Sequence, residues 1–170
     1  MTTKRLTTCA VLAALALALS YVEGMFPLPV PLPGFKLGLA NIVTLFALYA
    51  LGAADALAIL LTRVLLGAMF AGNASALIFS LLGGFCAMGV MILLARWEKL
   101  SVYGVSVGGA AAHNVGQVCA AMLTLGGTAP LAYLPVLLVV ALFSGALTGF
   151  ITGLLLRSAR YSHMMGGTHG

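Results

Sequence analysis

Six apolar stretches, separated only by short breaks, dominate this sequence and restrict what it can fold into. They cover about residues 6–22, 37–51, 56–71, 76–95, 102–125 and 131–156. A helix needs about 20 apolar residues to cross the hydrocarbon core of a bilayer, and 62% of the 170 residues are hydrophobic whereas only 6% are charged. The sequence therefore predicts an all-α integral membrane protein, a single bundle of six transmembrane helices over residues 1–170 that contacts the lipid bilayer directly.

The longest break lies between the first two stretches, at residues 23–36. Four prolines occupy alternate positions from Pro27 to Pro33, and proline both fixes φ and lacks the backbone N–H that a helix needs. We therefore expect an extended loop with apolar side chains here. The stretches at 37–51 and 56–71 are short for a complete crossing, so their helices are predicted to be tilted or irregular.

Basic residues near the ends of the stretches predict the orientation of the bundle. With the amino terminus inside, six of the eight Lys and Arg residues lie on the cytoplasmic side: Lys4, Arg5, Arg96, Lys99, Arg157 and Arg160. Only Lys36 then lies outside, in keeping with the usual excess of Lys and Arg in cytoplasmic loops. Both termini are thus expected in the cytoplasm, with residues 157–170 as a tail. A signal peptide cleaved near residues 14–16 is the alternative, but its loss would leave an odd number of helices.

Several function classes lack the residues that they require. The sequence has no GxxxxGK[ST] motif for ATP, no CxxC or HExxH motif for a metal, and only three acidic residues in all. Cys9, Cys86 and Cys119 stand singly within apolar stretches, which favours a packing role. We expect no catalytic residue, metal or cofactor. We expect no nucleic-acid partner either, because the basic residues lie near the ends of the apolar stretches, where they set the orientation of the helices in the membrane. Energy for an active process has to come from a partner protein.

Ionisable side chains at membrane depth mark candidate binding residues, because their burial in lipid is costly. Arg63 is the clearest case, since it follows Asp55 by eight residues, or about 12 Å along a helix, which places it near the bilayer centre. Its guanidinium offers forked donors that suit a carboxylate or a phosphate. The alternative is a structural arginine that caps carbonyl groups or pairs with Asp55.

A second candidate feature is a polar patch in the fifth stretch. His113, Asn114 and Gln117 are spaced so that they share one helix face. They form either a cavity wall or hydrogen bonds between helices. The predicted substrate-binding set adds residues nearer the outer side to these three and Arg63, namely Lys36 at the outer mouth, Asn41 on the second helix and Asn73 at an outer turn.

Small residues recur at every fourth position in three of the predicted helices. This spacing allows helix backbones to approach closely in a membrane. In the fifth and sixth helices it includes Gly116, Gly145 and Gly149, and packing within the bundle is the expected role. In the first helix Ala10, Ala14 and Ala18 form such a face, which is equally suited to contact another protein.

Two segments resemble a known family. Residues 36–45 after the proline loop, together with residues 112–117 around His113, are similar to the bacterial Gx transporter family, also known as heptaprenyl diphosphate synthase component I. That family in turn resembles the substrate-binding S components of energy-coupling factor transporters. The resemblance implies an S-component-like fold in the bacterial cell membrane, a pocket near the outer face, a lid formed by residues 23–36, and a coupling subunit that docks on the alanine face of the first helix.

Two functional hypotheses follow. In the first, the chain is a substrate-binding subunit for uptake of a small anionic or amphipathic metabolite, energised in trans by a transmembrane coupling subunit and ATPases. Arg63 and Lys36 would supply charge to its pocket. In the second, the chain is a non-catalytic accessory membrane subunit of a soluble prenyl diphosphate synthase. The scarcity of acidic residues argues against a catalytic role in prenyl transfer, which needs an aspartate-rich magnesium site.

Overall fold

The computed structural model describes residues 2–25, 38–72 and 74–166, and in these residues every regular element is helical. The elements are α1 (Thr3–Met25), α2 (Ala40–Ala50), α3 (Ala53–Ala71), α4 (Ala74–Ala95), α5 (Val102–Leu125), the short 3-10 helix η1 (Ala129–Tyr133) and α6 (Leu134–Gly166). The predicted all-α bundle of six helices is therefore confirmed.

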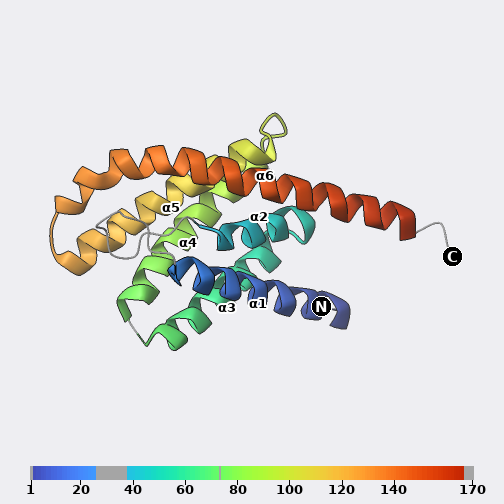
Figure 1. Cartoon of the computed structure of the whole chain (residues 1–170), viewed down its shortest axis with the longest axis horizontal. Coiled ribbons are helices and arrows are strands. Elements are labelled where there is room, and N and C mark those ends of the chain that lie inside the picture. Colours follow the sequence, from blue (N-terminus) through green and yellow to red (C-terminus); the bar gives the residue numbers. More distant parts are fainter. Residues whose placement is uncertain (1, 26–37, 73, 167–170) are drawn as a thin grey trace.

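The first turns of α1 and the last turns of α6 lie at the same end of the bundle, as predicted. Figure 1 shows them together, while the α3–α4 turn and the connection from α5 to α6 lie at the opposite end. The terminal segments carry Lys4, Arg5, Arg157 and Arg160, so we call this the basic end and the opposite one the outer end. The excess of Lys and Arg predicts that the basic end faces the cytoplasm.

Four helical segments have the length and apolar composition of a membrane span: Thr3–Met25, Ala53–Phe70, Ala74–Ala95 and Ala129–Tyr161. Helix α5 has 24 residues, but it is more polar than these four. It packs between α4 and α6 (Figure 1), so its polar side chains are buried in protein rather than in lipid. This shielding allows a helix with His, Asn and Gln at its centre to lie inside a membrane bundle.

Helix α2 is shorter than its apolar stretch. It has 11 residues, or about 16 Å, roughly half the thickness of the hydrocarbon core. The chain turns into this helix at Gly38, whose φ of +86° lies in the region that favours glycine. The second span, which was predicted to be tilted or irregular, is therefore a helix too short to cross the whole membrane.

The last helix is longer than its apolar stretch and extends beyond the other helices at the basic end (Figure 1). The apolar run ends near residue 156, but the helix continues through Arg157 to Gly166. No glycine or proline occurs between Arg157 and Gly166 to stop it.

Close backbone contacts hold α5 in place, as the spacing of small residues predicted. A Cβ atom added to Gly116 would lie 2.5 Å from the carbonyl oxygen of Leu82 and 2.9 Å from the Cα of Gly83, both on α4. On α6, a Cβ on Gly145 would lie 2.7 Å from the Cα of Val107. Only glycine permits these approaches, because the neighbouring atoms belong to the backbone and cannot move aside cheaply.

We expect Gly116→Ala to destabilise the bundle by about 1–3 kcal/mol, the usual effect of overpacking. The matched control is Gly89→Ala in α4, where an added Cβ would meet no heavy atom within 4 Å. Thermal unfolding of both variants in the same detergent measures the difference. Equal melting temperatures would contradict the packing described here.

Candidate functional site

Arg63 lies deep in the bundle on α3, about 15 Å from the start of that helix. Its side chain is only 9% exposed. One guanidinium nitrogen, Nη1, donates to the hydroxyl oxygen of Ser20 on α1 at 3.0 Å, and the carboxylate of Glu23 adds a favourable charge interaction. The Nε–H is buried and has no hydrogen-bond acceptor in the described part of the chain, so the hydrogen-bonding capacity of the guanidinium is only partly used.

Asp55 does not pair with Arg63, so that alternative from the sequence is wrong. Asp55 accepts a hydrogen bond from Nε of Arg5, and Nη2 of Arg5 also donates to the carbonyl oxygen of Leu51 at 3.1 Å. This ion pair joins α1 to the start of α3 at the basic end. Asp55 also lies in the first turn of α3, where the helix dipole favours a negative charge. Arg63 is therefore left to interact with α1 near the outer end.

Glu23 has a structural function that the sequence did not predict. Its side chain is buried, and its two carboxylate oxygens accept hydrogen bonds from the backbone N–H groups of Gly38 and Leu39. This clamp ties the outer end of α1 to the start of α2. Most of the predicted lid at residues 23–36, Lys36 among them, lies outside the described residues, as does Asn73.

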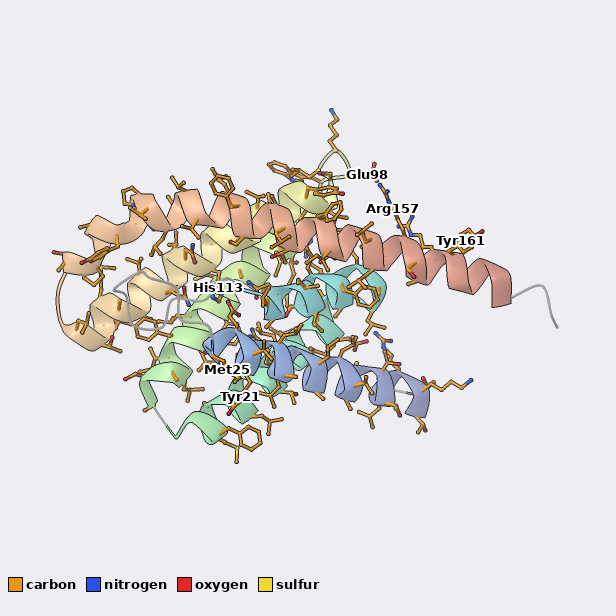
Figure 2. The ribbon with its side chains drawn as sticks, viewed as in Figure 1. Tyr21, Met25, Glu98, His113, Arg157 and Tyr161 are labelled. Atoms are coloured by element: carbon orange, nitrogen blue, oxygen red, sulfur yellow. The ribbon has the colours of Figure 1, made fainter. Side chains whose placement is uncertain are left out.

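The predicted polar patch of α5 divides between two neighbouring helices. His113 and Gln117 face α4, where a Cβ on Gly83 would lie 2.8 Å from Cε1 of His113 and 3.2 Å from Cγ of Gln117. The missing side chain of Gly83 makes room for both. Figure 2 places His113 in the interior of the bundle. Asn114 instead faces α6, where its Nδ2 donates to the carbonyl oxygen of Leu137 at 2.7 Å.

Asn41 is buried on α2 and lines a small cavity with Ser106 of α5 and Thr148 of α6. The volume of this cavity is about 10 Å³, enough for about one water molecule. A space of this size is far smaller than the usual small-molecule site.

A much larger cavity lies between α1, α3 and α4. Its volume is about 870 Å³, within the usual range for small-molecule sites. Arg63 and Ser20 contribute its polar wall together with Ser80 of α4, and the other lining residues are mainly apolar or small. We call it the Arg63 cavity.

Small residues on three helices create this space. Gly67 and Ala68 line it from α3, and Ala76 lines it from α4. From α1, Ala14 and Ala18 line it as well. Sequence reasoning identified Arg63 but missed Ser20 and Ser80. Their signal was weak, because an isolated serine in an apolar stretch usually bonds within its own helix.

The family model of heptaprenyl diphosphate synthase component I matches residues 12–155. The chain belongs to this family. The fold of this family member is also similar to a solved structure described as the S component of a bacterial ECF transporter, with a TM-score of 0.62 and 18% identity over 97% of this chain and 99% of that chain. No curated protein matches the sequence.

These comparisons confirm the family and the S-component fold that the sequence predicted. At 18% identity the structural similarity establishes the fold alone. With its apolar helices, this family member is a multi-pass membrane protein. The face formed by Ala10, Ala14 and Ala18 is exposed along α1, and its role in docking stays a prediction.

We expect Glu23→Ala to destabilise the fold by about 1–3 kcal/mol, because the backbone N–H groups of Gly38 and Leu39 would lose their acceptor. Amide hydrogen exchange should accelerate at the start of α2 and stay unchanged in α4. Glu98→Ala is the control, since Glu98 is exposed in the α4–α5 loop. Unchanged exchange in the Glu23 variant would exclude the clamp.

Proposed function

We propose that this protein is a substrate-binding subunit of an uptake transporter in the bacterial plasma membrane, and that its substrate is a small anionic or amphipathic metabolite. The observation that carries the proposal is the Arg63 cavity, a space of ligand size with a buried guanidinium in its wall. The S-component fold supports the same reading. No residue is assigned a catalytic role.

The hydrogen-bond donors of Arg63 favour an acidic ligand. Ser20, its hydrogen-bond partner, is neutral, and the carboxylate of Glu23 accepts hydrogen bonds from Gly38 and Leu39, just before α2. A carboxylate or phosphate that enters the cavity would supply acceptors to the guanidinium and stabilise its charge, which burial otherwise penalises. Of the other predicted substrate-binding residues, Lys36 and Asn73 lie outside the described residues. Asn41, His113, Asn114 and Gln117 do not line the Arg63 cavity, so we propose that Arg63 makes the main polar contact with the substrate.

Energy for uptake would come from other proteins. The sequence holds no ATP-binding loop. Helix α1 presents the exposed alanines Ala10, Ala14 and Ala18, and small residues at this spacing allow a partner helix to approach closely. We propose that a transmembrane coupling subunit with ATPases docks on this face.

A second candidate function follows from the family match. The description of the family names heptaprenyl diphosphate synthase component I, which favours an accessory membrane subunit that works with a soluble prenyl diphosphate synthase. A cavity with one buried cation and apolar walls also suits a diphosphate with an isoprenoid tail. In that function the chain would hold substrate or product rather than catalyse the transfer.

We expect Arg63→Gln to lower the amount of co-purified small molecule about tenfold or more, the loss expected when a charge-assisted hydrogen bond is removed. The protein is purified from its native membranes, and its extract is analysed by mass spectrometry. Arg157→Gln is the matched control, because Arg157 is exposed on α6. Equal ligand content in both variants would contradict binding by Arg63.

We expect Ala10→Trp to abolish co-purification of the partner and to leave ligand content unchanged, because Ala10 is exposed on α1 and does not line the Arg63 cavity. Val11→Trp is the control, since Val11 is exposed on an adjacent face of the same turn. Loss of a coupling subunit and its ATPases in the Ala10 variant alone supports the transporter. Recovery of a soluble prenyl synthase from the unaltered protein would favour the second function instead.

A further inference from the structure

The Arg63 cavity opens along the flank of the bundle. Its wall on α1 includes Ala14, Ala18, Tyr21 and Met25, which lie on one face of the helix because they are spaced by three or four residues. All four are exposed. They cover about 16 Å of α1, or roughly half the hydrocarbon thickness. In a membrane, an opening of this length beside a spanning helix faces lipid.

Helix packing leaves this side open. Among the described residues, α1 packs mainly against α2 and α3, and α4 packs mainly against α3 and α5. Extensive α1–α4 packing is absent from that part of the chain, so the two helices form the two edges of the opening.

The edges of the opening near the outer end are apolar and strongly exposed. Tyr21 is 72% exposed, Met25 65% and Phe70 77%. Figure 2 shows Tyr21 and Met25 near the outer end of α1. A tyrosine at this depth is typical of the membrane interface, where its ring lies in the apolar region and its hydroxyl contacts water.

The polar group in the wall lies nearer the outer end of α1 than its middle. Ser20 holds the guanidinium of Arg63, and it precedes Met25, the last residue of α1, by five residues, or about 8 Å. From there the cavity continues toward the bilayer centre past Leu17 to Ala14, with apolar walls. An acidic head at Arg63 with its tail toward Ala14 would have the orientation of an amphiphile in the outer leaflet.

We propose that the Arg63 cavity takes its ligand from the outer leaflet through the opening between α1 and α4, and that this ligand is a single-chain amphiphile with an acidic head. The guanidinium side chain of Arg63, which lies in the wall of the cavity, binds the head. The volume of about 870 Å³ suits one chain. This inference rests on the proposed function, because it assigns the substrate class and the access route of the same cavity.

The test uses the full-length protein in lipid nanodiscs and a C16 fatty acid with a diazirine near the middle of its tail. After photolysis, labelled peptides are mapped by mass spectrometry. We expect labels in α1 near Ala14 and in α4, competed by unlabelled palmitate. Arg63→Gln should reduce this labelling about tenfold or more, and Arg157→Gln should not. The corresponding C16 alcohol, which lacks the acid, should label these segments weakly.

A second variant tests the access route. Ala76→Trp places a large side chain at the α4 edge of the opening, and Ile78→Trp places the same side chain at an exposed position of α4 outside the cavity lining. We expect only the Ala76 variant to lose labelling. Labelling that is unchanged in Ala76→Trp, that is equal with the alcohol, or that persists in Arg63→Gln overturns the inference.

The outcomes also separate this inference from the proposed function. A water-soluble acid that co-purifies in an Arg63-dependent manner, without labelling by the fatty acid, overturns the lateral route and leaves the substrate-binding subunit intact. Competed, Arg63-dependent labelling without any co-purified transport partner supports the lateral site and counts against the transporter.

Discussion

The close packing of α5 between α4 and α6 is the constraint on which the rest of the bundle depends. A helix with His113, Asn114 and Gln117 near its centre is too polar to face lipid, so it must be enclosed by protein. Gly116 allows this enclosure because it has no Cβ, so the backbones of α5 and α4 can come into direct contact there. With α5 held between its neighbours, α1 and α3 pack away from it, and the Arg63 cavity lies on that other side.

A second constraint acts at the outer end. Helix α2 crosses only about half of the hydrocarbon core, and Glu23 ties its first residues to α1 through two backbone N–H groups. Backbone groups at membrane depth need such internal partners, because lipid offers none. The same carboxylate also has a favourable charge interaction with Arg63. Glu23 therefore interacts both with the backbone before α2 and with the charged group of the cavity.

The proposed docking face and the proposed cavity share residues. Ala14 and Ala18 belong to the exposed alanine face of α1, and both also line the Arg63 cavity. A partner helix packed on this face would therefore cover part of the opening between α1 and α4. The two proposals therefore use neighbouring parts of one surface of α1, with Ala10 in the docking face alone.

The sequence by itself determined the number of helices and the common side of the first and last helix ends, because hydropathy and charge are properties of one helix at a time. Only the tertiary structure decided that Arg63 meets Ser20 rather than Asp55, that Asn114 separates from His113 and Gln117, and that Glu23 binds the start of α2. These outcomes depend on how each helix is rotated against its neighbours. Rotation is set by side-chain packing between segments far apart in the chain, which no local pattern encodes.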